Sequence, residues 1–314
     1  MRLAASLLAV VLMLTASVCA AAESTYHLHP QAVAKDTYVF IGDTNFFNPA
    51  NGGNIVNTGF IVTDAGVVVI DTGPSLRYGQ EMRRAIAEVT DRKVVKVVIT
   101  HSHPDHFLGS QAFVGEAPVV SGAATVAMIR DHGQELAGNL YTLVGDVMRG
   151  TEPVVPEVFD TPAETIGGHD LHYYFLSGHT DSDVAVFDRT TGVLFTGDLV
   201  FFRRALTVPN ANIPRWLDSL KVIEGIPYRH LVPGHGPVPS GRQAPAETRA
   251  YLLWIDKTLR AAVAGGLDIT EIYRIKIPER FRSLAIVGEE FQRSVGQMVP
   301  RIESTALPVV GGAP

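Results

Sequence analysis

The segment that most constrains the fold is KVVKVVITHSHPDHFLGS, residues 93–110. Its first part, residues 94–100, is rich in Val and Ile with few polar breaks, which is typical of a strand buried on both faces of a sheet. Three imidazoles and one carboxylate follow this strand directly: His101, His103, Asp105 and His106. Such a cluster is either a polar turn with hydrogen-bonded histidines or part of a metal site.

The rest of the chain predicts two similar halves. Strands are expected at residues 37–43, on both sides of a turn at 64–66, at 117–122, and within 171–178, 183–198 and 230–236. A helix is expected in each half, at 76–89 and at about 213–224. Strands followed by helices in each half suit two packed sheets with helices outside. We therefore expect an α/β fold of the four-layer αββα type.

The C-terminal part of the chain is expected to be mainly helical, with shorter helices at 269–275 and 285–302. A longer helical region is expected earlier, at 123–149. Its apolar face carries Leu136, Leu140, Leu143, Val144 and Val147. We expect one main domain over residues 23–238 and a helical extension over 239–314 that packs on it.

The N-terminus has the pattern of a secretory signal peptide, which we place at residues 1–22. Arg2 precedes an apolar run over residues 3–14, and small residues follow. This run is shorter than the roughly 20 residues that a membrane-spanning helix needs. Cys19 is the only cysteine of the chain, so the processed protein would have no thiolate. We expect a periplasmic or secreted protein with no stable membrane span after processing.

The composition indicates a globular protein, with 46% hydrophobic and 18% charged residues. The formal net charge is -6, and no block of Lys and Arg interrupts the chain. Both features argue against a nucleic-acid partner, which requires a basic surface.

Further polar residues follow later strands in the same way as the first cluster. They are Asp71 in VIDTG, His179 in SGHT, Asp198 in FTGD and His235 in PGHG. Histidine is the commonest protein ligand for zinc, and carboxylates complete such sites. His101 and His103 project to one side of an extended segment, whereas Pro104 turns the chain before the next pair. Two neighbouring metal ions, about 3.5–4 Å apart, would accommodate both pairs.

These motifs, in this order, resemble the metallo-β-lactamase superfamily of metal-dependent hydrolases from about Tyr38 to Pro237. The resemblance implies an αββα sandwich, with residues 23–238 as its metallo-β-lactamase-like domain. It implies two zinc ions per chain. One ion would be held by His101, His103 and His179, the other by Asp105, His106 and His235, with Asp198 between them. Asp71 would fix a ligand loop from outside; otherwise it caps a turn.

The implied reaction is hydrolysis by a hydroxide that bridges the two metal ions. Two Zn²⁺ ions offset by two carboxylates and a hydroxide leave a positively charged core. Such a core lowers the pKa of bound water to about 7 and stabilises an oxyanion. Asp105 would orient the hydroxide and shuttle a proton. The expected substrate is a small molecule with an ester, thioester or amide-type bond.

Several branches of the superfamily can be compared with this ligand set. His103 argues against the iron-based branch, which has Glu at that position. The processed chain lacks the cysteine ligand of one lactamase class, and Asp198 is usually absent from the class with an all-His/Asp site. Asp198 therefore favours the ligand set of glyoxalase II. A β-lactamase, a glyoxalase II-like thioesterase and a non-hydrolytic assembly module stay open as alternatives.

A narrower resemblance comes from three segments: NGGNIVNTGFIVTDAGVVVIDTGPS, THSHPDHFLGSQAF and NLYTLVGDVMRGTE. They are similar to exported proteins called quinoprotein relay system zinc metallohydrolases. This resemblance implies a link to a periplasmic quinoprotein dehydrogenase system but supplies no substrate.

Two loops could contact a substrate. Phe46 and Phe47 lie on a Gly/Asn-rich loop, where they would either cover the metal edge or pack beneath the loop. Arg203 and Arg204 follow Asp198 closely, and they would either meet an anionic substrate or face solvent.

Overall fold

The apolar run before the histidines forms strand β5 (Val94–Val98). It lies between β4 (Gly66–Ile70) and β6 (Val119–Ser121) and runs parallel to both. These strands belong to a seven-stranded sheet in the order β1-β2-β3-β4-β5-β6-β7. Its other strands are β1 (Gln31–Ala34), β2 (Thr37–Phe40), β3 (Thr58–Thr63) and β7 (Glu157–Val158). Because β4 and β5 are parallel, the residues that follow them emerge at the same edge of the sheet.

The second sheet has five strands in the order β12-β11-β10-β9-β8. Its strands are β8 (Ala163–Ile166), β9 (His169–Leu176), β10 (Asp183–Asp188), β11 (Val193–Phe195) and β12 (His230–Val232). β11 and β12 pair in parallel and the other pairs are antiparallel. The chain crosses from β11 to β12 through helix α4 (Ile213–Gly225). Both of these strands therefore also end at one common edge.

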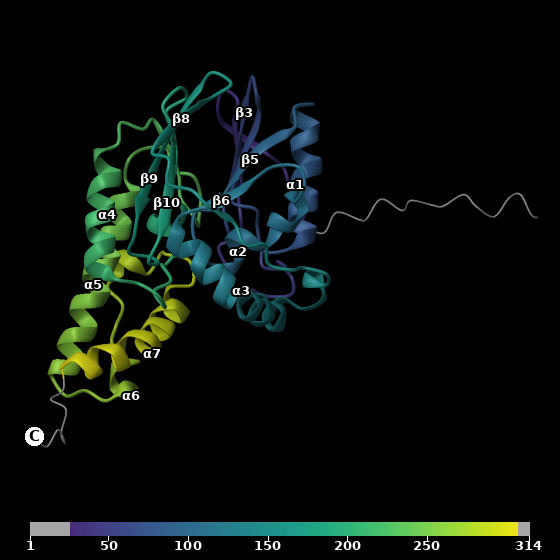
Figure 1. Ribbon diagram of the computed structural model, residues 1–314. Helices are drawn as coiled ribbons and strands as arrows, with labels where there is room; N and C mark the ends of the chain where they lie inside the picture. Colours follow the sequence, from purple (N-terminus) through teal and green to yellow (C-terminus); the bar gives the residue numbers. More distant parts are fainter. Residues whose placement is uncertain (1–25, 307–314) are drawn as a thin grey trace, which may run out of the picture.

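Helices and two sheets form four layers, which can be followed in Figure 1. Three buried apolar cores lie between these layers. Alternating residues of β4 point to opposite faces: Val67 and Val69 pack toward the outer helices, whereas Val68 and Ile70 pack between the two sheets. In the second sheet, Phe187 packs toward the helices of the other side. The predicted αββα arrangement is therefore confirmed.

The helices cover both outer faces of the sandwich. On the side of the first sheet lie α1 (Leu76–Val89), α2 (Pro104–Phe107) and α3 (Ala123–Val144). On the side of the second sheet lie α4, α5 (Ala244–Ala264), α6 (Ile269–Ile272) and α7 (Val287–Ala306). Short 3₁₀ turns occur at η2 (Leu108–Phe113), η3 (Gly145–Met148), η4 (Gly197–Leu199) and η5 (Glu279–Phe281). α5 and α7 share one buried core with β10 and β11.

The apolar face predicted for residues 123–149 is wider than the core of the protein requires. Leu140 and Val144 are buried, whereas Leu143, on the same predicted apolar face, is 51% exposed. Leu136, Leu140 and Leu143 instead line a cavity beside α3. The apolar stripe therefore serves both the core and the wall of a cavity.

The computed structural model describes residues 26–306. The predicted signal peptide, residues 1–22, lies outside the described residues. Within the described range, no helix combines the length and the apolar character needed to cross a membrane.

Candidate metal centre

The ends of strands from both sheets meet at one edge of the sandwich. β5 ends before His101, β9 before His179, β11 before Asp198 and β12 before His235. Residues 103–107 turn from the end of the β5 segment into α2, whose first residue is Pro104. The structure thus brings together all seven side chains that the sequence predicts as metal ligands.

The seven side chains form two groups. One group contains His101, His103, His179 and Asp198, and the other contains Asp105, His106 and His235. Within each group, one possible ligand atom from every residue lies within 4.8 Å of those from the others. Each group is compact enough to hold one metal ion.

Asp198 lies between the two groups. Its Oδ2 atom is 3.2 Å from His179 Nε2 and 3.2 Å from His235 Nε2. Its Oδ1 atom is 3.2 Å from His106 Nε2. One carboxylate therefore contacts histidines of both groups.

Polar partners outside the cluster orient four of the imidazoles. His106 Nδ1 lies 2.8 Å from Asp71 Oδ2, and His235 Nδ1 lies 2.7 Å from the carbonyl oxygen of Ile55. His103 Nε2 lies 3.1 Å from Asn210 Oδ1, and His101 Nδ1 lies 3.1 Å from the Thr100 hydroxyl. In each ring the other nitrogen faces the cluster. Metal-ligating histidines are commonly oriented by such contacts.

Asp71 occupies a constrained position next to the cluster but joins neither group. Its backbone has φ 55° and its side chain is almost completely buried. The Asp71 carboxylate accepts hydrogen bonds of 2.8 Å from the Thr100 backbone N–H, the Thr100 hydroxyl and His106 Nδ1. It therefore connects the end of β4 to the segment that carries the first histidines.

Several atoms that face the cluster are buried and make no well-aligned hydrogen bond within the described residues. They are His101 Nε2, His106 Nε2, Asp105 Oδ2 and Asp198 Oδ1. Leaving buried polar atoms without partners costs about 1–3 kcal/mol each. A divalent cation would satisfy them together, and a set of imidazole nitrogens and carboxylate oxygens suits zinc. The residues present therefore fit the expected metal ions.

The charge states of the cluster also suit cation binding. Burial lowers the pKa of His101 well below its usual value and lowers that of His103 to about 4, so both rings are neutral at pH 7. Burial opposes ionisation of Asp198, but the neighbouring His235, His106 and His179 hold its pKa well below the usual value. Burial likewise opposes protonation of His106, yet the carboxylates of Asp198, Asp71 and Asp105 raise its pKa well above 6.5. At His106, a metal ion would replace a proton.

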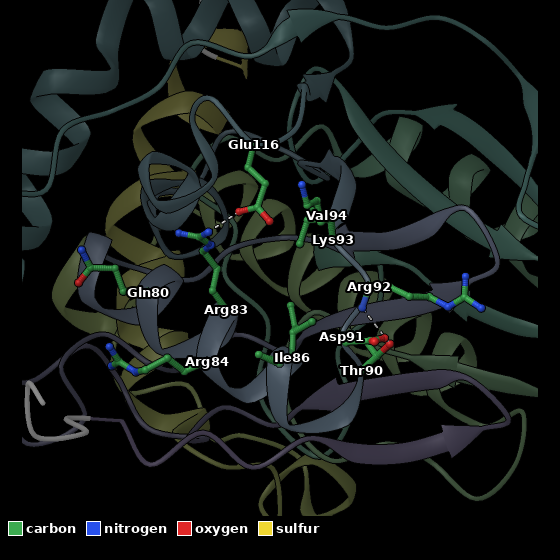
Figure 2. Close-up of a pocket in the computed structure, with 11 residues that line it drawn as sticks. Gln80, Arg83, Arg84, Ile86, Thr90, Asp91, Arg92, Lys93, Val94 and Glu116 are labelled. Atoms are coloured by element: carbon green, nitrogen blue, oxygen red, sulfur yellow. Dashed lines mark hydrogen bonds and ion pairs between the residues drawn. The ribbon is translucent and has the colours of Figure 1, made fainter.

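A cavity of about 320 Å³ opens onto the cluster. Asp105, Asp198 and His235 form part of its wall, together with apolar residues of α3. A different hollow, shown in Figure 2, lies at the C-terminal end of α1 and is lined by Arg83, Glu116 and other residues. That hollow contains none of the seven clustered side chains, so the first cavity is the candidate reaction site.

The structure separates the four predicted substrate contacts. Phe46 and Phe47 both line the cavity, and Phe47 also packs against the core beneath the first sheet. Arg204 lines the cavity as well and is only 2% exposed, so the alternative that it faces solvent was wrong. Arg203 is exposed and lies outside the cavity wall, with its guanidinium over the Phe202 ring.

Other contributors to the site were not predicted. Asn210 follows Arg203 and Arg204 in the chain and contacts His103, but nothing in the sequence distinguishes it from its neighbours. The contact from Ile55 uses a backbone carbonyl, which has no sequence signal. Glu290 and Arg293 reach the cavity region from α7, far along the chain.

A sequence model of the metallo-beta-lactamase superfamily matches residues 51–235, more than half of the chain. The chain belongs to this superfamily. The match contains all seven clustered residues and ends at His235. Helices α5 to α7 lie beyond it.

Individual relatives of this superfamily are distant. A linear primary-alkylsulfatase from Pseudomonas sp. is 24% identical over 287 residues, which cover 76% of this chain and 53% of the relative. A metallo-beta-lactamase type 2 from Bacillus sp. is 26% identical over 197 residues, which cover 60% of this chain and 70% of the relative. An atrochrysone carboxyl ACP thioesterase from Aspergillus fumigatus is 22% identical over 182 residues, 58% of this chain and 51% of the relative. The chain thus spans about half the length of the alkylsulfatase and of the thioesterase.

Solved structures of the superfamily share the fold. The metallo-beta-lactamase from Pontibacter korlensis superposes with a TM-score of 0.59 at 23% identity, covering 72% of this chain and 99% of its own. The metallo-beta-lactamase IND-7 gives a TM-score of 0.58 at 20% identity, covering 72% of this chain and 98% of its own. These similarities support the αββα architecture.

Proposed function

We propose that this protein is an exported dinuclear zinc hydrolase that cleaves an ester, thioester or amide-type bond of a small molecule. The observation that carries the proposal is the position of Asp198, which contacts histidines of both groups. A single carboxylate that contacts two compact donor groups is well placed to be shared by two adjacent metal ions. Membership of a superfamily that includes named hydrolases supports the same conclusion.

His101, His103 and His179 would hold one ion, Asp105, His106 and His235 the other, and Asp198 would contact both. Zinc bound there would lower the pKa of water to about 7 and polarise the bond to be cleaved. The carboxylate of Asp105 lines the cavity, with Oδ2 3.5 Å from His235 Nε2. Its other oxygen, Oδ1, would accept a proton from water and return it to the leaving group. Phe46 and Phe47 would exclude bulk water from one side.

The named relatives include a sulfatase, a lactamase and a thioesterase, so a sulfate ester joins the candidate substrates. The Asp198 position favours a thioester or ester over a β-lactam, because lactamases with an all-His/Asp site usually lack this carboxylate.

We further propose that the protein works outside the cytoplasm, in association with a periplasmic quinoprotein dehydrogenase system. The signal-like N-terminus and the three sequence segments given above support this assignment. Cell fractionation tests the location: the processed protein should be found in the periplasmic or secreted fraction, and accumulation of the full-length chain in the cytoplasm would contradict it.

The decisive biochemical experiment measures metal content and hydrolysis in one preparation. We expect two zinc ions per folded chain and turnover of at least one member of a panel of thioesters, acyl esters, lactones, alkyl sulfates and β-lactams. Asp105→Asn should retain the fold and lose turnover. A well-folded protein with less than one zinc ion per chain would refute the dinuclear assignment. If a penicillin or carbapenem is hydrolysed faster than the other substrates of the panel, the protein is a β-lactamase instead.

A further inference from the structure

The cavity above the metal centre has two chemically different walls. One wall is apolar and consists of Leu136, Leu140 and Leu143 of α3 with Phe46 and Phe47 of the loop before β3. The other wall contains Arg204, Thr207 and Arg293. A cavity of about 320 Å³ with this division suits a small amphipathic molecule.

Arg204 is buried with much of its hydrogen-bonding capacity unused. Its Nη1 donates to the carbonyl oxygen of Ala205 at 3.1 Å, and its Nη2 lies 3.6 Å from Glu290 Oε1. Its Nε is buried and finds no acceptor within the described part of the chain. Burial lowers the pKa of Arg204, but a guanidinium stays protonated near neutral pH. A buried cation with unused donors at a cavity wall is suited to binding an anion.

Glu290 of α7 holds this wall together. Its Oε1 accepts a hydrogen bond of 2.7 Å from the Thr207 hydroxyl and lies 3.3 Å from Arg293 Nη1. Its side chain is almost fully buried. Two guanidinium groups therefore share one carboxylate, which leaves this wall with one net positive charge. A monoanion would neutralise that charge.

Arg293 also connects α7 to the aromatic side of the cavity. Its guanidinium lies 5.7 Å from the centre of the Phe46 ring, within the range of a cation–π contact. Glu290 and Arg293 both lie beyond residues 51–235, the part that matches the superfamily. In Figure 1, α7 lies below the two sheets, on the side where α3 also ends.

We propose that α7 makes this cavity specific for a substrate that carries a carboxylate next to an apolar portion. Arg204 and Arg293 bind the carboxylate, Glu290 is a positioning residue for both, and the leucines of α3 contact the apolar portion. This assignment rests on the proposed function, because it takes the clustered histidines as the reacting centre. It makes the C-terminal extension a determinant of substrate choice.

Binding of octanoate and of 1-octanol to the zinc-loaded full-length protein tests the proposal by calorimetry. We expect octanoate to bind more tightly than octanol. Arg293→Gln should weaken octanoate binding by about 10–100-fold, the scale of one charge-assisted hydrogen bond, without changing octanol binding. Arg293 is partly exposed, so this variant should fold. Arg204→Gln should act in the same direction, and melting temperature and zinc content verify its fold. Arg274→Gln, an exposed arginine of the same extension, is the matched control and should change neither affinity.

Equal affinity for octanoate and octanol, or an Arg293→Gln variant with unchanged octanoate affinity, would overturn the proposal. If zinc alone binds the carboxylate, Arg293→Gln would leave the octanoate affinity unchanged. Hydrolysis of two esters gives an independent readout: 4-nitrophenyl octanoate, and the mono-4-nitrophenyl ester of suberate, which has a free carboxylate at the far end of the same chain. The ratio of their kcat/KM values should favour the suberate ester and fall in Arg293→Gln. Zinc-loaded protein that cleaves neither ester but still binds octanoate through Arg293 would refute the hydrolase and leave the anion site intact.

Discussion

Replacing Asp71 with Asn tests how the outer carboxylate controls one half of the cluster. Asp71 accepts three hydrogen bonds of 2.8 Å, one of them from His106 Nδ1. The amide oxygen of Asn can still accept the hydrogen bond from the Thr100 backbone N–H. The amide NH₂ group would then face His106 Nδ1, and it can donate a hydrogen bond but cannot accept one. His106 would then favour the tautomer with its proton on Nε2, the nitrogen that faces Asp105 and Asp198.

The expected effect is a selective loss of zinc affinity. Outer partners of metal-ligating histidines typically contribute 10–100-fold in affinity, which corresponds to about 1.4–2.8 kcal/mol. The lost hydrogen bond to a charged group is worth about 1.5–3 kcal/mol, so the two magnitudes agree. We expect the site of Asp105, His106 and His235 to weaken by about 10–100-fold, and the other site to change much less.

Competition with a chromophoric zinc chelator measures both affinities in one titration. Asp188→Asn is the matched control, because Asp188 is fully buried and lies 2.8 Å from His169 Nδ1, away from the cluster. The control should lower the melting temperature and leave both zinc affinities unchanged. Unchanged zinc affinity in Asp71→Asn, or an equal loss in Asp188→Asn, would contradict a role of Asp71 in orienting His106.

Three further predictions concern the cluster and its support. Asp198→Asn should reduce zinc content below two per chain and lower hydrolysis by more than about 100-fold, the upper range for outer partners alone; full zinc content with normal turnover would contradict the shared carboxylate. On acidification, the zinc ion at His106 should leave first. The pKa of His106 is raised whereas that of His103 is about 4, so protons compete with zinc for His106 at a higher pH than for His103. Loss of both ions in one step during dialysis from pH 7.5 to 5 would argue against this order. Trp216→Ala should destabilise the protein by about 3–5 kcal/mol, since the ring is fully buried and its Nε1 donates to Leu199 O at 2.9 Å; an unchanged denaturant midpoint would contradict that packing.

The sequence predicted the fold well where local patterns decide it. The Val-rich run before His101 forms the buried strand β5, and the helix expected at 76–89 has those bounds in the structure. Strand alternation and helical periodicity are local properties, so they can be read without tertiary information. The position of His and Asp residues after strands likewise predicted that their side chains would meet at one edge.

The remainder of the site depends on contacts that no local pattern encodes. Leu143 has the spacing of a core residue, yet it is exposed and lines the cavity. Helical periodicity predicts which residues share a face of the helix, but it does not predict what that face packs against. Arg204 is buried because Glu290, 86 positions later, lies against it. A pairing over that distance becomes visible only when α7 is placed in space.

Anomalous diffraction at the zinc absorption edge would locate the bound metal ions directly. We expect two zinc peaks, about 3.5–4 Å apart, one next to His101, His103 and His179 and the other next to Asp105, His106 and His235. Asp198 should contact both. A single peak, or two ions held by other residues, would contradict a dinuclear centre shared through Asp198.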